Sequence, residues 1–202
     1  MAPTTARQRV LREARRRSFL TAADFARVHV HSQQLTRLVR EGVLERVARG
    51  RYRLAGRPIS EHHALAIIAA ATPGAVVCLL SALTFHGIGT QVPFEVWIAL
   101  DRGARAPAIS YPPLRIARFS GPAFREGIEV HRLEGQRVRV YNVAKTMADL
   151  FKYRKKIGLE VVLEALREVW RDRRVTIDEI DHYARICRVE RVMRPYLEAL
   201  IA

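Results

Sequence analysis

The spacing of apolar residues near the start of the chain predicts two short helices joined by a tight corner. Thr21 and Asp24 form a capping pair for the first helix, and the corner falls at residues 28–31. Ser32 is expected to cap the second helix, and Gly42 to end it in a left-handed conformation. The predicted buried stripe of the second helix consists of Leu35, Leu38 and Val39. The opposite face of this helix is therefore expected to be polar and exposed.

Alternating residues after the second helix predict a two-stranded ribbon. Residues 43–47 and 51–54 flank an Arg-Gly pair, which suits a two-residue turn with glycine in second position. Strand alternation directs Tyr52 toward the core and Arg53 toward solvent. Helix, corner, helix and ribbon follow one another as in a winged helix-turn-helix, which we expect over residues 1–57.

The remaining residues, 58–202, predict a larger domain of mixed structure. Its expected strands cover residues 94–100, 114–119, 128–133 and 138–140. Its expected helices cover residues 60–71, 81–86, 142–153, 159–171, 177–186 and 189–201. Because the strands come mostly before the helices, the fold class predicted for this domain is α+β.

Charge is concentrated at the start of the chain. Residues 1–57 hold 14 arginines and four acidic residues, whereas the whole chain has 35 basic and 20 acidic residues. A basic segment with few compensating acids predicts a polyanionic partner, with an affinity that falls as salt rises. Together with the winged-helix pattern, this predicts binding to double-stranded DNA.

The expected DNA contacts divide between the second helix and the ribbon. Glutamine can pair with adenine and arginine with guanine in the major groove. We therefore expect base readout, or contact with nearby phosphates, from Gln33, Gln34, Thr36, Arg37 and Arg40. The expected wing contacts are Arg49, Arg51 and Arg53. The alternative is a small helical domain whose arginine face is simply solvated.

Cysteine content and hydropathy narrow the other possibilities. Cys78 and Cys187 lie far apart in apolar settings, which indicates a reduced cytoplasm and no disulfide scaffold. Arginines interrupt the N-terminal segment, so no signal peptide is expected, and the longest apolar stretch, 64–71, is too short to span a bilayer. No histidine or cysteine spacing suits zinc. We expect a cytoplasmic protein with no membrane partner, metal or cofactor.

Three blocks of sequence resemble the AbiEi family of antitoxins. The N-terminal block runs from FLTAAD (19–24) to ERVARGRY (45–52). The second is SALTFHG (81–87), and the third is AKTMADLFKYRKKIGLEVVLEALR (144–167). Together they cover nearly the whole chain, and their combination is more specific than any one block.

The resemblance implies a bifunctional bacterial protein. The N-terminal domain of such antitoxins represses its own operon at inverted repeats, and the C-terminal domain counteracts a nucleotidyltransferase toxin, AbiEii, encoded beside it. This arrangement is a type IV toxin–antitoxin system, and many such systems act in phage defence. Inverted repeats imply two copies on DNA, from a chain that is a monomer or weak dimer in solution. Direct binding of the toxin does not follow from the resemblance.

One basic patch in residues 58–202 is a candidate antitoxin surface. Lys145, Asp149 and Lys152 recur at i, i+4 and i+7 of a predicted helix, opposite its apolar residues. The whole patch comprises Lys145, Asp149, Lys152, Arg154, Lys155 and Lys156. It would meet the toxin, its nucleotide or its RNA substrate. The alternative is an exposed helix face with a weak Lys–Asp pair.

Other functions remain as alternatives. Ser81 and His86 would need a third group and an oxyanion hole to act as a hydrolase, and a structural histidine at a helix end explains His86 more simply. The sequence contains no P-loop or kinase-like glycine motif. We therefore expect no enzyme, although an atypical phosphotransferase acting on the toxin stays open. A plain transcription regulator with a ligand-sensing second domain is the remaining alternative.

Overall fold

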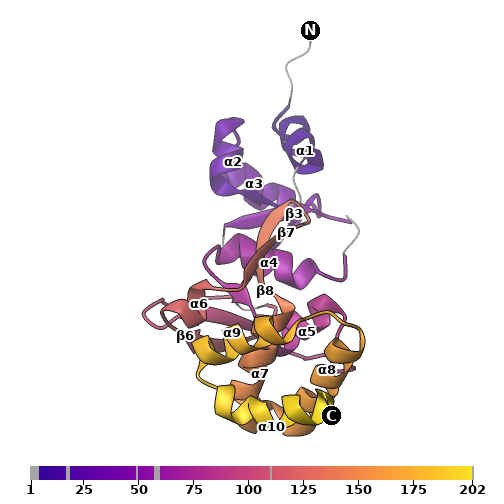
Figure 1. The fold of residues 1–202 in the computed structure, drawn as a ribbon. Coiled ribbons are helices and arrows are strands. Elements are labelled where there is room, and N and C mark those ends of the chain that lie inside the picture. The colour runs from indigo at the N-terminus through magenta and orange to yellow at the C-terminus, as the bar shows by residue number, and fades with distance from the viewer. Residues whose placement is uncertain (1–4, 17–18, 49, 57–59, 110, 202) are drawn as a thin grey trace. The chain divides into compact units, whose positions relative to one another are not determined.

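The fold is α+β, with helices and two sheets, as the sequence predicted at this level. The computed structural model describes residues 5–16, 19–48, 50–56, 60–109 and 111–201 (Figure 1). The chain divides into two compact units. The first comprises Met1–Pro73, Pro107–Pro112 and Arg132–Val138, and the second comprises Gly74–Ala106, Pro113–His131 and Arg139–Ala202. The boundary after residue 57 between a DNA-binding and an antitoxin domain stays a prediction.

The first unit combines short helices with a small antiparallel sheet. Its elements are α1 (Ala6–Arg16), β1 (Leu20–Thr21), α2 (Ala22–Arg27), α3 (Ser32–Arg40), β2 (Leu44–Ala48), β3 (Arg51–Leu54) and α4 (His63–Ala71). The strand order in the sheet is β1-β3-β2. The pairing of β1 with β3, through Leu20 and Tyr52, was not predicted.

Local sequence explains the corner between α2 and α3. The Thr21 hydroxyl accepts from the Asp24 N–H, and the Asp24 carboxylate accepts from the Thr21 N–H, which is the predicted capping box. At the end of α3, Gly42 has a φ of 68°, so it turns the chain in the predicted left-handed conformation. The prediction of Ser32 as the second cap was wrong. His31 is the N-cap, and its N–H donates to the Gln34 side chain.

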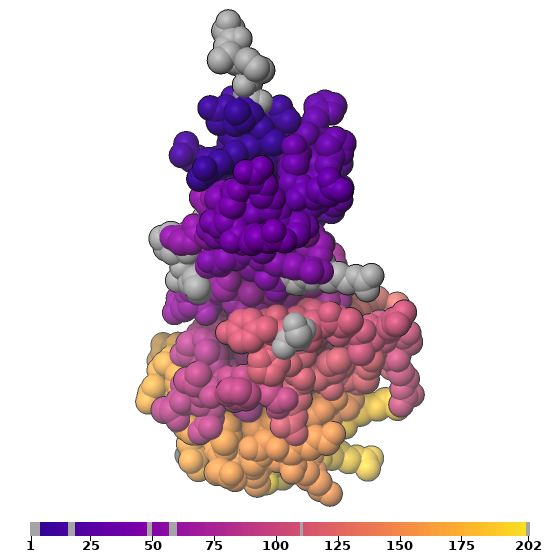
Figure 2. All heavy atoms as spheres, turned by 180° about the vertical axis from the view of Figure 1, so that it is seen from behind, coloured from indigo at the N-terminus to yellow at the C-terminus, as the bar shows by residue number. Residues whose placement is uncertain are grey.

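The small sheet is covered on both faces. One face packs on the apolar residues of α1, α2 and α3, and Figure 2 shows the indigo atoms of α1 directly against the violet atoms that follow. This core consists of Val10, Ala14, Leu20, Phe25, Val30, Leu35, Leu38 and Leu44. The other face packs on α4, through Phe19, Val47, Ala66 and Ile67. Both faces of the sheet therefore contribute residues to a core, although Glu45 and Arg46 of β2 remain exposed.

The second unit is built on a five-stranded mixed sheet. Its elements are β4 (Val76–Val77), α5 (Leu79–His86), β5 (Val96–Asp101), β6 (Leu114–Phe119), α6 (Pro122–Arg125), β7 (Ile128–Leu133), β8 (Gln136–Tyr141), α7 (Val143–Ile157), α8 (Leu159–Arg171), α9 (Ile177–Cys187) and α10 (Glu190–Ile201). The strand order is β6-β5-β4-β8-β7. Strands β5 and β6 are parallel, whereas β4 and β5 are antiparallel. The predicted strands and C-terminal helices agree closely with these bounds.

Helix α7 forms the centre of the second unit, among α8, α9 and α10 (Figure 1). Its residues from Ala144 to Phe151 are buried on every side. The turn between β7 and β8 is formed by Glu134 and Gly135, which both have positive φ, as a tight hairpin turn requires. The tip of this hairpin belongs to the first unit, although both strands begin or end in the second. Within the described residues, no helix combines the length and hydropathy needed to span a bilayer.

Candidate nucleic-acid interface

The helix α3 exposes the polar face that the sequence predicted. Leu35 and Leu38 are buried in the core of the first unit, and Val39 packs against it. The exposed residues are Gln33, Gln34, Thr36, Arg37 and Arg40. The structure therefore places all five predicted residues on one exposed stretch of a helix whose other side is anchored.

Three of these five side chains already have local partners. The Gln34 Oε1 atom accepts from the His31 N–H at 3.1 Å, and the Thr36 hydroxyl donates to the Ser32 carbonyl. The Arg37 Nε atom lies 2.7 Å from Glu41 Oε1, although the Arg37 side chain is 80% exposed. Exposed pairs of this kind contribute about 0–1 kcal/mol, so a phosphate or base could replace the carboxylate at little cost.

The other two residues of α3 predicted to contact bases are Gln33 and Arg40. Within the described part of the chain, Gln33 and Arg40 form no hydrogen bond or ion pair among side chains. A hollow of about 280 Å³ lies at the start of the same helix, lined in part by His29, His31 and Ser32. The N–H groups at a helix start favour anions, so this end of α3 suits a backbone phosphate.

The hairpin of β2 and β3 differs from the prediction at one residue. Arg53 was expected to face solvent, but its side chain is only 7% exposed. Alternation along β3 does hold, because Tyr52 packs toward Phe25 and Arg53 points to the opposite face. That opposite face is covered by α4, so a residue directed away from the first core enters a second one. Arg53 is therefore not available to DNA.

The other wing residues keep some exposure. Arg51 is half-buried and Arg46 is exposed, and both lie on the hairpin. Arg49, the third predicted wing contact, lies outside the described residues. The exposed basic edge of the hairpin thus consists of Arg46 and Arg51 among the residues described.

The buried Arg53 belongs to a chain of polar side chains. Its Nε atom lies 2.7 Å from Glu45 Oε2 on the neighbouring strand, and its Nη1 atom lies 3.4 Å from His63 Nε2 on α4. The His63 Nδ1 atom lies 2.8 Å from Glu134 Oε2, and Phe19 stacks on the His63 ring. This chain was not predicted from the sequence, because Glu134 is 71 positions away from His63.

Glu134 is further held by Ser60. Its Oε1 atom accepts from the Ser60 N–H at 3.2 Å and from the Ser60 hydroxyl at 2.7 Å. Burial alone would raise the pKa of Glu134, but the hydrogen bonds from His63 and Ser60 outweigh it and lower this pKa below its ordinary value. Glu134 is therefore held as a carboxylate.

The predicted antitoxin surface is wrong for two of its six residues. Lys145 and Asp149 are completely buried, with Lys145 Nζ 2.6 Å from Asp149 Oδ2. The ammonium group also lies over the rings of Tyr141 and Phe119, at 4.1 and 4.8 Å from their centroids. A lysine and an aspartate one helical turn apart neutralise each other, so both side chains can be buried in a protein interior. The alternative interpretation, an exposed helix face, is also wrong for Lys145 and Asp149, because both are buried.

The surroundings of the pair explain how it is accommodated. Asp149 Oδ1 accepts from the Cys187 thiol at 3.3 Å, and burial raises the pKa of Asp149 above its ordinary value. Burial likewise raises the pKa of Cys187 to about 12. Gly127 allows the close approach to Lys145, because a Cβ atom at Gly127 would lie 2.7 Å from the Lys145 Cβ. This cluster is a structural element of the second unit.

Four members of the predicted patch remain at the surface of α7. Lys152, Lys155 and Lys156 are exposed and Arg154 is half-buried. Arg154 donates to the Phe151 carbonyl at 2.8 Å, and Lys152 donates to the Cys187 carbonyl at 3.2 Å. Lys155 and Lys156 are therefore the most accessible charges of the patch.

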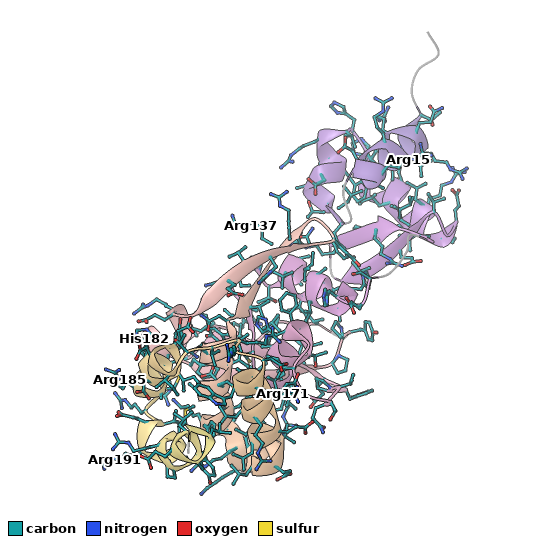
Figure 3. The ribbon with its side chains drawn as sticks, turned by 45° about the vertical axis from the view of Figure 1, so that its right-hand side comes forward. Arg15, Arg137, Arg171, His182, Arg185 and Arg191 are labelled. Carbon is teal, nitrogen blue, oxygen red and sulfur yellow. The ribbon has the colours of Figure 1, made fainter. Side chains whose placement is uncertain are left out.

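A second basic set was missed by the sequence analysis. It occupies the end of α9 and the start of α10, where Figure 3 shows Arg185 and Arg191 projecting outward. The set consists of Arg185, Arg188, Arg191 and Arg194, all exposed, at every third position. A hollow of about 320 Å³ lies among the first three. The three-residue spacing of these arginines could have predicted the set from the sequence.

The hydrolase alternative has no geometric support. The Ser81 hydroxyl accepts from the Trp97 N–H at 2.9 Å, and His86 Nε2 lies 2.8 Å from the Tyr141 carbonyl. The two side chains therefore have separate structural partners. Burial also lowers the pKa of His86. Among the described residues, no group of three or more His, Cys, Asp or Glu side chains is arranged to hold a metal ion.

Comparison with known proteins gives a family match for the first unit. The family model described as a transcriptional regulator, AbiEi antitoxin, matches residues 8–55. The match supports the AbiEi resemblance for these residues. No curated protein matches the chain.

Comparison with solved structures supports the fold over most of the chain. The crystal structure of the RV2827C protein from Mycobacterium tuberculosis is similar with a TM-score of 0.67. The similarity covers 91% of this chain and 72% of that chain, at 15% sequence identity. At this identity, the likeness concerns the fold alone.

The buried pair predicts an asymmetric response to substitution. Lys145→Ala leaves the Asp149 carboxylate buried without its partner, so we expect a loss of about 3–5 kcal/mol in the free energy of unfolding. Lys145→Met/Asp149→Leu removes both charges and is expected to lose much less. Chemical denaturation checks both, with the exposed Lys155→Ala as the matched control. Equal losses in the single and double variants would contradict this account.

Glu134 predicts a pH-dependent contribution to stability. Because folding lowers its pKa, the stabilisation is present above the pKa of the unfolded chain and is lost as pH falls through the folded pKa. The difference in the free energy of unfolding between the wild-type chain and Glu134→Gln should be constant from pH 7 to about 5 and shrink below about pH 4.5. Urea denaturation across this range measures it. A difference that instead grew toward acid pH would contradict the assignment.

Proposed function

We propose, on the premise that residues 8–55 belong to the AbiEi antitoxin family of transcriptional regulators, that the chain represses its own operon and counteracts a toxin. In this proposal the first unit is a winged helix-turn-helix. Helix α3 enters the major groove, and the hairpin of β2 and β3, the wing, contacts the sugar–phosphate backbone. Residues 58–202 form the antitoxin domain.

The observation that carries the proposal is the exposed face of α3. Gln33 and Arg40 have the functional groups that pair with adenine and guanine, and both are exposed on a helix anchored by its other side. Arg37 can also contact DNA once its exposed ion pair with Glu41 breaks. Thr36 lies on the same exposed stretch. Gln34, whose side-chain oxygen is used at the helix start, retains only its amide group as a donor.

The surroundings of α3 favour the same orientation on DNA. The start of the helix has N–H groups beside a hollow, and the wing exposes Arg46 and Arg51. Phosphate contacts of this kind fix the position of a protein on the duplex, whereas base contacts select the sequence. Two copies on an inverted repeat would place one α3 in each half-site.

The antitoxin activity is proposed from the description of the matching family. Its opponent is a nucleotidyltransferase toxin encoded beside this gene. The accessible residues of the α7 patch, Lys152, Lys155 and Lys156 with Arg154, are the proposed surface for this activity. Their positive charge suits the toxin's nucleotide, its RNA substrate or an acidic surface of the toxin.

The role of α3 predicts a loss of specific DNA binding. Arg37→Ala/Arg40→Ala should weaken binding to the chain's own promoter by about 100-fold, since each base contact contributes about 1–3 kcal/mol. The preference over a scrambled duplex should also fall. Fluorescence anisotropy with labelled duplexes measures both.

Arg171→Ala/Arg194→Ala is the matched control for this experiment. It removes two positive charges from the second unit, each of which is paired there with an acidic residue. The control should bind the promoter as the wild-type chain does. If the α3 variant and the control behave alike, α3 is not the reading helix.

The α7 patch predicts a loss of toxin neutralisation without a loss of folding. Lys152→Ala/Lys155→Ala/Lys156→Ala should reduce the growth of toxin-expressing cells at least about tenfold relative to wild type, because it removes the charges of the proposed antitoxin surface. Since the three side chains are exposed, their removal should have little effect on stability. Lys145 is left unchanged because its removal is expected to destabilise the unit. Full rescue by the triple variant, at equal protein level, would leave the patch without an antitoxic role.

A further inference from the structure

The hydrogen bonds of the polar chain in the first unit select one tautomer of a neutral His63 ring. Arginine only donates hydrogen bonds, so the contact between Arg53 Nη1 and His63 Nε2 requires an unprotonated Nε2 atom. The proton of the neutral ring then sits on Nδ1, which donates to Glu134 Oε2 at 2.8 Å. The two contacts together therefore select the Nδ1–H tautomer of His63.

Three of the four members of this chain are shielded from solvent. The side chains of Arg53, His63 and Glu134 are 7%, 12% and 15% exposed, whereas that of Glu45 is 46% exposed. Burying a guanidinium without its partners is strongly unfavourable, so the position of Arg53 depends on those partners. Arg53 lies on β3, which is directly paired with β2 and forms one half of the wing.

We propose that Glu134 is a positioning residue for DNA binding. Its carboxylate fixes the tautomer of His63, and His63 in turn holds the Arg53 guanidinium that anchors the wing strand on α4. This inference rests on the proposed function, because the wing matters only if the first unit binds DNA. It adds that the wing is set by a residue far outside residues 1–57.

The position of Glu134 at the hairpin turn suits this role. Its φ of 46° places it in the left-handed region, and Gly135 completes the tight turn. Both Glu134 oxygens are used, one by His63 and one by Ser60, so the carboxylate has a single orientation. Both oxygens accept hydrogen bonds, so replacing either one by an amide nitrogen breaks one of these contacts.

DNA binding by the whole chain of 202 residues tests the inference. The probes are a duplex from the region upstream of the chain's own coding sequence and a scrambled duplex of equal length. Glu134→Gln keeps the volume of the side chain and should weaken binding to the promoter duplex about tenfold, a change of about 1.4 kcal/mol. Glu129→Gln, on the exposed part of β7, removes the same charge and should leave the affinity unchanged.

Arg53 supplies a second test that separates positioning from direct contact. Arg53→Lys keeps the positive charge but loses the fork that reaches Glu45 and His63 together. A phosphate contact would survive this change, whereas a positioning role predicts the same tenfold loss as Glu134→Gln. The double variant should lose little more than either single one, because both break one chain. Arg46→Lys, on the exposed edge of the wing, is the control.

The tautomer of His63 gives a signature that a general loss of stability would not produce. Nitrogen-15 spectra of the histidine rings should show an unprotonated Nε2 atom in the wild-type chain and a protonated one in Glu134→Ala. Protonation of Nε2 in the wild-type chain would overturn the inference.

The binding data separate the inference from the proposed function. Equal affinity of Glu134→Gln and Glu129→Gln, with a wild-type chain that prefers its promoter, overturns the positioning role and leaves the proposed function standing. A wild-type chain that binds both duplexes equally overturns the proposed function itself.

Discussion

The first unit is organised by the need to pair one buried guanidinium. Arg53 points away from the core under α1, α2 and α3, and α4 closes over it from the other face of the sheet. The free energy of burying such a group is unfavourable unless every donor finds an acceptor, so Glu45 and His63 must lie where they do. His63 then requires an acceptor of its own. Packing of an ordinary apolar helix on a small sheet thereby determines a polar chain that ends at Glu134.

The second unit applies the same physics in a more local form. Lys145 and Asp149 are separated by one helical turn, so the partner that each buried charge needs is supplied by the same helix. Aromatic rings and the Cys187 thiol provide the remaining contacts. The pair can thus be enclosed without help from a distant segment. The two units differ in the sequence distance over which a buried charge is compensated.

This difference explains which features the sequence predicted. The Thr21 cap, the left-handed Gly42, the alternation along β3 and the amphipathic C-terminal helices depend on neighbours within a few residues, and these expectations agree with the structure. The exposed face of α3 was predicted for the same reason. Arg53 and Lys145 were placed at the surface because charged residues in an alternating or helical pattern normally face water. They are covered by α4 in one case and by the helices around α7 in the other. This tertiary packing does not follow from the local sequence pattern.

The compact first unit extends beyond the residues of the winged-helix pattern. A chain that ended at residue 57 would lack α4. The sheet face that packs on α4 would then be exposed to solvent, and Arg53 would lose its contact with His63. The compact unit instead runs through Pro73 and includes residues 132–138. Strands β7 and β8 each begin or end in the second unit. The chain therefore passes between the two units within these strands as well as after residue 73.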